Sequence, residues 1–287
     1  ESNAVALVLL ANGDSLCSGS LLNNTAQDFR AYFLTAFHCI DVNDNGSISP
    51  TEESNAENWA FRFRYKKTSC GGSQVATYFT YNKDNLRAAW YTTDFALVEL
   101  QDSPLSDPRV AFLGWDRTGS TPTNGTCIHH PSGDVMKISF DYEGLSETSY
   151  GSNNGTNYWK VDWDIGATEP GSSGSPLFDQ NKRVIGQLSG GYSACGASDM
   201  RDWYGCFYRS WTGGGTNSTR LCNWLDPNNT GAQIINIMYP YITGPSLVCT
   251  SNSTFTLHNR PSGTTVNWTK SSNLQPVSGQ GTDNYTV

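Results

Sequence analysis

The sequence predicts an all-β fold, on the basis of its composition and of the spacing of its apolar residues. Charged residues make up only 15% of the 287 residues, aromatic residues reach 12%, and there are 28 glycines and 12 prolines. A helical protein normally carries more charge and fewer turn-forming residues. Short alternating apolar runs recur between turn residues, as in a β-sandwich or barrel. A chain of this length is compatible with one all-β unit or with a pair of fused barrels.

The predicted strands follow one another along the chain, separated by Gly, Asn, Ser, Thr or Pro. They are Val5–Leu10, Tyr32–Leu34, Trp59–Tyr65, Val75–Tyr81, Phe95–Leu100, Val135–Phe140, Tyr158–Trp163, Val184–Leu188 and Cys206–Trp211. One segment, Thr230–Tyr239, has a helical period instead, and predicts a short C-terminal helix. A parallel α/β architecture would need many longer helices, and the pattern does not supply them.

The composition changes at Ile242–Pro245. Beyond it, two alternating runs, Cys249–Leu257 and Thr264–Lys270, are joined by the turn residues Asn259–Gly263. They resemble the opening strands of an immunoglobulin-like module, which about forty residues cannot complete. We therefore expect residues 244–287 to be a fragment of an appended β module or a linker, with a surface tail of the first domain as the alternative.

The charge balance excludes two classes of partner. There are 18 basic and 26 acidic residues, for a net charge of −8. Nucleic acid and anionic membranes need clusters of Lys and Arg, so neither is expected to bind. No run of about twenty apolar residues predicts a membrane-spanning helix. Without an initiator Met or a basic leader, Glu1 is expected to begin a processed or truncated chain.

The eight cysteines favour disulfide bonds. They are Cys17, Cys39, Cys70, Cys127, Cys195, Cys206, Cys222 and Cys249. No Cys-x-x-Cys pair occurs, which weakens a zinc or redox interpretation. A scattered, even number in a chain of low charge is typical of an oxidising, extracellular compartment, so we expect secretion, with buried free thiols as the alternative.

Three segments carry the residue types of nucleophilic catalysis: Phe33–Cys39, Thr93–Val98 and Glu169–Pro176. Alone, each is as well explained by a structural histidine, a turn or a flexible loop. Together and in this order, they resemble Thr-Ala-x-His-Cys, Asp-hydrophobic-Ala-Leu and Gly-Asp-Ser-Gly-Gly-Pro of the chymotrypsin-like serine proteases. The resemblance implies two antiparallel six-stranded β-barrels, at about residues 1–120 and 121–243, within a protease domain of residues 1–243.

The chemistry assigns one role to each residue. Ser173 is the expected nucleophile, because a serine hydroxyl reacts once a base takes its proton. His38 is the expected general acid–base, and Asp94 the carboxylate that orients its ring. The backbone N–H groups of Gly171 and Ser173 are expected to form an oxyanion hole. The resemblance also implies a Cys17–Cys39 disulfide that clamps the histidine loop.

Longer strings resemble one branch of that family, bacterial lysyl endopeptidase, over roughly residues 1–237. They include Gly19–Thr25, Gly114–Arg117, Ile128–Pro131, Thr168–Pro176, Lys182–Leu188, Ser210–Gly215 and Trp224–Pro227. This branch cleaves after lysine, using a pocket acid in a local Asp-x-Tyr-Gly pattern. The resemblance assigns that acid to Asp202. Asp199 and Glu169 are the competing acids, and a solvated loop charge is the alternative for Asp202.

Tyr150 and Ser189 stand where the branch has an aromatic residue and a histidine lining the cleft, and Gly190 and Gly191 complete the expected substrate-binding residues. Without that histidine, an Arg or broad preference stays open. Ser189 is also a candidate hydrogen-bond partner of Asp94.

The residue before the nucleophile is Ser172 rather than Asp. Activation of the trypsin type, in which a freed N-terminal ammonium forms an ion pair with that Asp, is therefore not available. The resemblance further implies a preceding stretch with two cysteines as partners of Cys70 and Cys195, unless these pair with Cys127, Cys206 or Cys222. His129 and His130 lie outside the catalytic motifs and are assigned structural roles.

The segment Asp41–Glu52 fits the twelve-position EF-hand calcium loop. Oxygen-bearing residues fall at positions 1, 3, 5, 9 and 12, with glycine at 6 and an aliphatic residue at 8. The candidate ligands are Asp41, Asn43, Asn45, Ser47 and Glu52, with Glu53 as an alternative to Glu52. A bound Ca²⁺ would rigidify the histidine loop. An Asn/Asp/Gly surface turn is the alternative interpretation.

We therefore expect a secreted, monomeric serine endopeptidase that cleaves proteins or peptides after basic residues, preferably Lys. It needs no cofactor for catalysis, and Ca²⁺ is expected only as a structural ion. From a different class, an inactive homologue that serves as a calcium-dependent binding module is the competing hypothesis. The third hypothesis is a trypsin-like enzyme that cleaves after Arg or has broad specificity.

Overall fold

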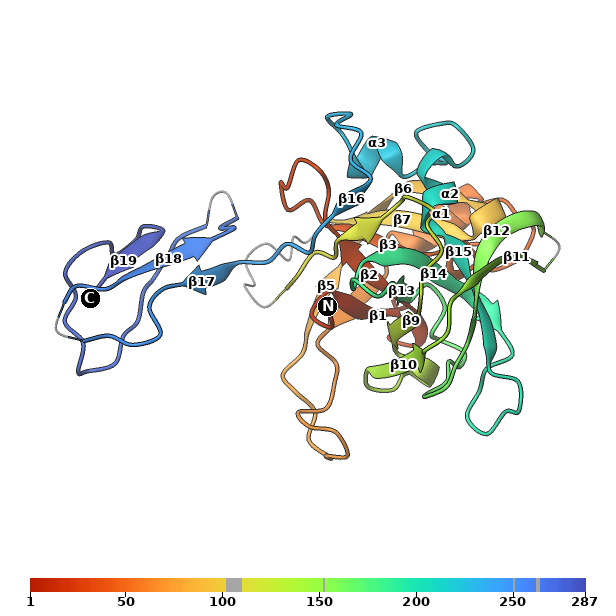
Figure 1. The fold of residues 1–287 in the computed structure, drawn as a ribbon. Helices are drawn as coiled ribbons and strands as arrows, with labels where there is room; N and C mark the ends of the chain where they lie inside the picture. Colours follow the sequence, from red (N-terminus) through yellow and green to blue (C-terminus); the bar gives the residue numbers. More distant parts are fainter. Residues whose placement is uncertain (102–109, 152, 250, 262–263) are drawn as a thin grey trace.

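The computed structural model describes residues 1–101, 110–151, 153–249, 251–261 and 264–287. Within these ranges the strands form three sheets, so the all-β prediction is confirmed. Figure 1 shows two of the sheets together in one body, with the third extending from it toward the C-terminus. No helix in the described part of the chain is long and apolar enough to cross a membrane.

The first sheet has seven antiparallel strands in the order β5-β4-β1-β2-β3-β7-β6. They are β1 (Val5–Leu9), β2 (Ser15–Leu22), β3 (Tyr32–Ala36), β4 (Ala60–Phe63), β5 (Phe79–Asn82), β6 (Asp84–Trp90) and β7 (Phe95–Leu100). Every residue of β1 and β3 is buried, which explains their continuous apolar character. Phe33 packs edge-to-face on Phe61 and Phe63 in the core of this sheet.

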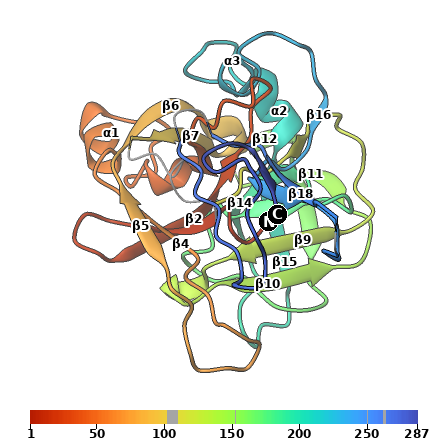
Figure 2. The same cartoon turned by 90° about the vertical axis from the view of Figure 1, so that its left-hand side faces the viewer.

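The second sheet has nine strands, along the order β10-β9-β13-β14-β15-β12-β11 with β8 and β16 beside it. They are β8 (Trp115–Asp116), β9 (Gly125–His129), β10 (Lys137–Asp141), β11 (Ser146–Tyr150), β12 (Asn153–Asp162), β13 (Pro176–Phe178), β14 (Val184–Gly191), β15 (Arg201–Cys206) and β16 (Ile234–Ile235). In the described residues the two sheets thus have seven and nine strands, and the expected count of six strands in each barrel is not confirmed. The extra pairings include a parallel contact between β8 and β14. The views in Figures 1 and 2 show this sheet against the first.

Two sequence assignments between residues 206 and 239 are corrected. Residues expected as a strand at 206–211 form helix α2 (Phe207–Thr212), because Phe207 and Trp211, four residues apart, both pack on Trp115. Residues 230–239 contain no helix, since Ile234 and Ile235 pair with β8 as strand β16. A short apolar run does not distinguish strand from helix by its period alone. The other α-helices of the described ranges are α1 (Pro50–Ala56) and α3 (Cys222–Leu225).

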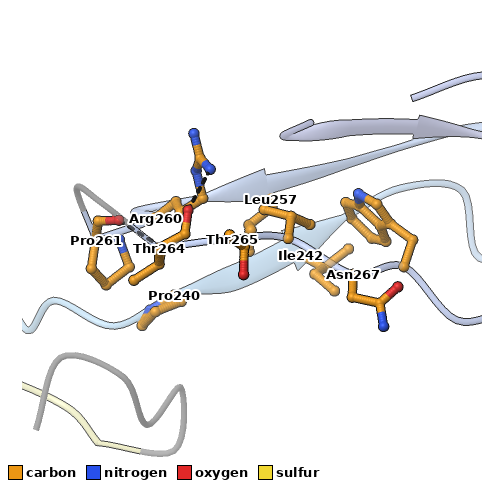
Figure 3. A pocket seen from close by; sticks show the side chains of 10 residues that line it. Pro240, Ile242, Leu257, Arg260, Pro261, Thr264, Thr265 and Asn267 are labelled. Atoms are coloured by element: carbon orange, nitrogen blue, oxygen red, sulfur yellow. Dashed lines mark hydrogen bonds between the residues drawn. The ribbon is translucent and has the colours of Figure 1, made fainter. Parts of the chain in front are cut away.

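The third sheet consists of β17 (Tyr241–Thr243), β18 (Thr254–His258) and β19 (Asn284–Thr286). The run expected at 264–270 is not a strand in its described part, and its Trp268 stacks on Tyr285 instead. Ile242, Leu257 and Trp268 line a pocket on this sheet (Figure 3).

Candidate active site

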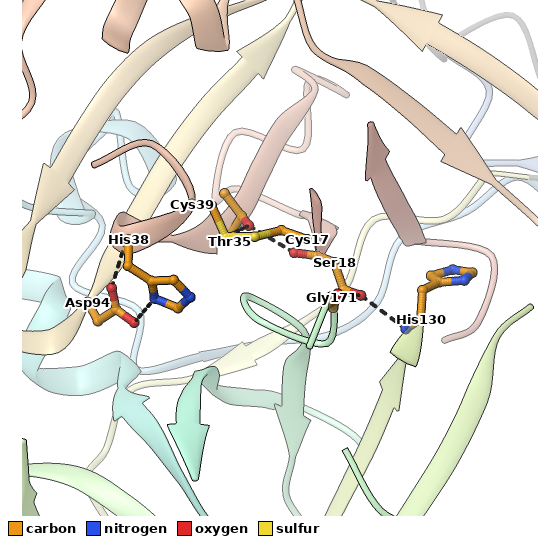
Figure 4. The surroundings of a disulfide bond; sticks show 8 residues. All are labelled: Cys17, Ser18, Thr35, His38, Cys39, Asp94, His130 and Gly171. Atoms are coloured by element: carbon orange, nitrogen blue, oxygen red, sulfur yellow. Dashed lines mark hydrogen bonds and ion pairs between the residues drawn. A yellow bond between two sulfur atoms is a disulfide. The ribbon is translucent and has the colours of Figure 1, made fainter. Parts of the chain in front are cut away.

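His38 and Asp94 are brought together by the pairing of β3 with β7. His38 lies in the 3₁₀ turn Phe37–Cys39 that follows β3, and Asp94 directly precedes β7. The ladder pairs Ala36 with Phe95, so the two functional residues are neighbours across it. Oδ1 of Asp94 accepts the backbone N–H of His38 at 2.9 Å, and Oδ2 lies 2.8 Å from Nδ1 of the ring (Figure 4). Asp94 thus fixes both the backbone and the ring of His38.

The contacts of Asp94 raise the pKa of the His38 imidazole. Burial lowers the pKa of His38, but the charge and the hydrogen bond of Asp94, helped by Asp44 and Asp41, more than offset it. The net pKa is raised above the ordinary value, as an opposite charge in direct contact should cause. The Asp94 side chain is nearly buried, whereas the His38 side chain is 38% exposed and accessible to a substrate.

A disulfide joins Cys17 on β2 to Cys39 beside the histidine, as the family resemblance implied. The neighbouring Thr35 hydroxyl donates to the Ser18 carbonyl, so β2 and β3 are tied together twice at this point (Figure 4). Among the described cysteines the other six are free, and Cys70 and Cys195 are exposed. The alternative pairings of Cys70 and Cys195 with Cys127, Cys206 or Cys222 are therefore not formed.

The loop of residues 167–174, which we call the oxyanion loop, holds the expected nucleophile. Gly171 has φ +93°, and a Cβ there would press to 3.2 Å from the His130 carbonyl oxygen, so the position suits glycine. The Pro170 carbonyl accepts the amide of Ser132 at 2.7 Å, and the Ser173 carbonyl accepts that of Ser18 at 2.8 Å.

Within the described residues, the N–H groups of Gly171 and Ser173 donate no hydrogen bond to the protein. Because carbonyl and N–H of one trans peptide point in opposite directions, the Pro170–Ser132 bond turns the Gly171 N–H away from Ser132. Two unengaged donors on either side of Ser172 are what an oxyanion hole requires.

Ser173 is half-buried. In the described part of the structure, no hydrogen bond joins its hydroxyl to His38. Such contacts are often long in a protease without substrate and tighten when substrate binds. The structure thus forms the His38–Asp94 contact directly and leaves the third contact of the expected triad open.

The cleft beside His38 is lined by Tyr150, Ser189, Tyr192 and Trp203. Tyr150 stacks on Trp203 with ring centroids 4.8 Å apart. Ser189 makes no hydrogen bond to Asp94 in the part of the chain described, so that suggested pairing is not formed.

The two residues after Ser189, Gly190 and Gly191, have no side chain. A Cβ on Gly190 would lie within 2.9 Å of the Tyr150 hydroxyl, and one on Gly191 would collide with Oδ1 of Asp202. Neighbouring atoms therefore leave no room for a side chain at either position.

Asp202 is completely buried on β15. Its Oδ2 accepts hydrogen bonds from the Trp163 indole at 2.6 Å and the Thr168 hydroxyl at 2.7 Å, whereas Oδ1 has no partner in the described structure. Burial raises its pKa, and these hydrogen bonds oppose the rise. A buried carboxylate with one free oxygen is a site that a cation would stabilise.

The competing acids are already paired. Asp199 forms an ion pair of 2.6 Å with Arg201, and Glu169 accepts from the Ser132 hydroxyl at 2.8 Å. Of the three candidate acids, Asp202 alone is buried. Its partners Trp163 and Thr168 are far from it in sequence, and sequence reasoning missed both.

The loop 41–52 brings most of its candidate ligands together. The Asp41 carboxylate accepts the amides of Asn45 and Gly46, and the Asn43 amide donates to Glu52 at 2.7 Å. Glu52 also forms a capping box with Ser49 at the start of α1. This contact holds the Glu52 side chain against the loop. Ser47 joins through its amide, which donates to the Asn45 side chain.

Comparison with known proteins identifies the family. The family model described as "Lysyl endopeptidase, C-terminal domain" matches residues 1–205. The chain is 31% identical over 207 residues to a protein named lysyl endopeptidase from Pseudomonas aeruginosa, which covers 68% of this chain and 42% of that protein. The chain thus spans less than half the length of this relative.

Two solved structures show more distant likeness. The HtrA-type protease AlgW with tripeptide is 18% identical, with a TM-score of 0.48 over 71% of this chain and 56% of that one. The MamO protease domain from Magnetospirillum magneticum is 12% identical, with a TM-score of 0.45 over 71% and 92% of the two chains.

The sheets, the His38–Asp94 contact and the loop before Ser173 are the features expected of a trypsin-like serine protease. Within that class the chain belongs to the lysyl endopeptidase family, whose C-terminal-domain model matches most of its length.

Proposed function

We propose that this domain hydrolyses peptide bonds in proteins or peptides after basic residues, preferably lysine. The observation that carries the proposal is the unpartnered Oδ1 of the buried Asp202, whose neighbour on β15, Trp203, lines the same cleft as His38. A lysine ammonium reaching Oδ1 would satisfy it, and a neutral side chain would leave it unpaired. The 31% identity to a lysyl endopeptidase supports the same specificity.

In the proposed mechanism, Nε2 of His38 takes the proton of the Ser173 hydroxyl as the serine oxygen attacks the carbonyl carbon. Asp94 holds the Nδ1–H and stabilises the imidazolium that forms. The N–H groups of Gly171 and Ser173 donate hydrogen bonds to the developing oxyanion. His38 then gives its proton to the leaving amine as the C–N bond breaks, and water hydrolyses the acyl-enzyme on Ser173 by the reverse proton path.

Two measurements test this proposal. A fluorophosphonate should label Ser173 of the folded protein and fail to label a Ser173→Ala variant; no adduct would favour the inactive binding module. Digestion of a denatured protein, with the cleavage sites mapped by mass spectrometry, should show cuts after Lys. Equal cutting after Lys and Arg, or cuts without a basic residue, would replace the lysine preference by the broader specificity.

We further propose that the loop 41–52 binds Ca²⁺ as a structural ion. Bound Ca²⁺ would offset the charges of Asp41 and Asp44, which help to raise the pKa of His38. Added Ca²⁺ should therefore raise the melting temperature and move the acidic limb of the activity profile to lower pH, and Glu52→Gln should weaken both effects. Identical melting curves in EDTA and in Ca²⁺ would exclude the site.

Further proposals concern the whole protein. The Cys17–Cys39 disulfide supports secretion, since such bonds persist in oxidising compartments. The net charge of −8 argues against nucleic acid or an anionic membrane as a partner. We propose residues 1–243 as a monomeric protease domain and residues 244–287 as a fragment of an appended β module.

A further inference from the structure

Ser172, the residue before the expected nucleophile, is completely buried and makes an unusual contact. Its hydroxyl oxygen accepts the amide of Glu169 at 3.2 Å and lies 2.8 Å from Nδ1 of His129, on strand β9. His129 is itself fully buried. A residue of the second sheet that sequence analysis treated as structural thus reaches the turn that carries Ser173.

The hydrogen bonds around His129 have one consistent direction. Ser139 donates its hydroxyl hydrogen to the Ala167 carbonyl at 3.5 Å, so its oxygen accepts from Nε2 of His129 at 3.2 Å and the proton of the neutral ring is on Nε2. Nδ1 is then an acceptor, and the Ser172 hydroxyl, whose oxygen accepts the Glu169 amide, donates to it. Burial, with a smaller effect of His130, lowers the pKa of His129 to about 3, so a neutral ring is the stable form.

One imidazole therefore links two points of the oxyanion loop, Ala167 and Ser172, to strands β9 and β10. Between these points lies Gly171, whose N–H is one expected oxyanion donor, and directly after them lies Ser173, whose N–H is the other. The Ser172 carbonyl accepts the amide of Ser175 at 3.0 Å, which turns the Ser173 N–H the opposite way. The conformation of Ser172 thus sets the direction of a donor without Ser172 facing the cleft.

We propose that His129 and Ser172 are positioning residues that hold the oxyanion loop in its active conformation through a neutral hydrogen bond. This inference rests on the proposed serine protease function. Residue 172 is a serine rather than an aspartate, so it cannot anchor the loop through an ion pair. The neutral hydrogen bond between Ser172 and His129 anchors the loop instead. The pair stabilises the oxyanion in the transition state and contributes nothing to the binding of the lysine side chain at Asp202.

The test separates transition-state stabilisation from substrate binding. The variants are Ser172→Ala, His129→Leu and His129→Asn. In His129→Asn, the side-chain oxygen lies close to the position of Nδ1 in the wild type and can still accept a hydrogen bond from Ser172. Ser20→Ala is the matched control, because Ser20 is a fully buried serine whose hydroxyl has no partner among the described residues. The probe is a peptide aldehyde ending in the residue after which the wild type cleaves, which adds to Ser173 and places its oxygen in the oxyanion hole.

Ser172→Ala and His129→Leu should lower kcat by about 10- to 100-fold, less than loss of a whole oxyanion donor, and weaken the aldehyde by the same factor. The KM of these two variants should change less than about twofold. His129→Asn should recover most of kcat, and the control Ser20→Ala should have the kcat and KM of the wild type. Unchanged kcat, or equal losses in kcat and in ground-state binding, would overturn the proposal. If His129→Leu does not fold, the smaller Ser172→Ala truncation decides. A wild-type chain that neither cleaves nor labels would refute the proposed function instead, and this inference with it.

Discussion

The hydroxyl of Thr168 donates a hydrogen bond of 2.7 Å to Oδ2 of Asp202, and the Thr168 amide donates to the Ser193 hydroxyl at 2.9 Å. Thr168 belongs to the oxyanion loop, whereas Asp202 is the expected acid of the specificity pocket. The bond therefore couples the strand proposed to bind the substrate cation to the loop proposed to bind the oxyanion. It also occupies Oδ2, so that Oδ1 alone is left for a ligand.

Replacing Asp202 by Asn should selectively remove cleavage after lysine. The ammonium would then enter a buried pocket without an opposing charge, which costs about 2–5 kcal/mol, or roughly 30- to 5000-fold in kcat/KM. Steady-state kinetics on a lysine substrate measure the loss. Asp199→Asn is the control, because Asp199 is paired with Arg201 and should be nearly silent. Full lysine cleavage by Asp202→Asn would move the pocket acid to Asp199 or Glu169.

Replacing Thr168 by Val keeps its shape and removes its hydroxyl. A buried hydrogen bond to a carboxylate contributes about 1.5–3 kcal/mol, so we expect kcat/KM for lysine substrates to fall about tenfold or more. Thr168→Ser retains the hydroxyl and should retain most of the activity. Should Val and Ser variants behave alike in the same kinetic assay, the hydroxyl has no role in the pocket.

Activity should rise with pH through the raised pKa of His38, because only the neutral ring accepts the Ser173 proton. Asp94→Asn removes the charge that raises this pKa, so the acidic limb of kcat/KM should move to lower pH. The same variant should lose about 10⁴-fold in kcat, since the ring is no longer held in the required tautomer. A pH–rate profile of both proteins tests the two effects; an unmoved acidic limb would show that another group controls it.

The parts of this molecule that depend on local pattern were predictable from sequence, and the parts that depend on distant contacts were not. The His38–Asp94 contact and the Cys17–Cys39 disulfide followed from short motifs next to strands. The Ser172–His129 contact joins residues 43 apart, and neither residue carries a local signal of it.

The misassigned segments show the same limit. Ile234 and Ile235 have a helical spacing with Met238, but the unsatisfied edge of β8 pairs with them as a strand. Tertiary hydrogen bonding overrides a weak periodicity in so short a segment. Helix α2 is the converse, because packing on Trp115 selects a helix where alternation predicted a strand.

Removing the disulfide with Cys17→Ser and Cys39→Ser should destabilise the fold. The bond spans 22 residues, and a loop of that size loses about 3 kcal/mol of stabilisation when it is opened. Urea denaturation should show the midpoint shift to lower concentration. Cys70→Ser is the control, because Cys70 is an exposed free thiol and its loss should leave the midpoint unchanged. A double variant as stable as the wild type would show that the native clamp adds nothing to the hydrogen bonds between β2 and β3.

Asp84, at the start of β6, should make the protein less stable as pH rises. Its carboxylate is fully buried and has no partner for either oxygen in the described structure. Burial, reinforced by the charge of Glu57, raises its pKa to about 8. An unfolded Asp titrates near 3.9, so between about pH 4 and 8 the unfolded chain releases a proton that the folded chain keeps, and the unfolding free energy falls by about 1.4 kcal/mol per pH unit.

Asp84→Asn cannot titrate and should lack this component. Urea denaturation at pH 5 and pH 8 should show the variant gaining stability over the wild type as pH increases, with the exposed Asp14→Asn following the wild type at both values. A constant difference between Asp84→Asn and the wild type at the two pH values would mean that Asp84 is ionised in the folded protein. A cation or water would then have to compensate for its buried charge.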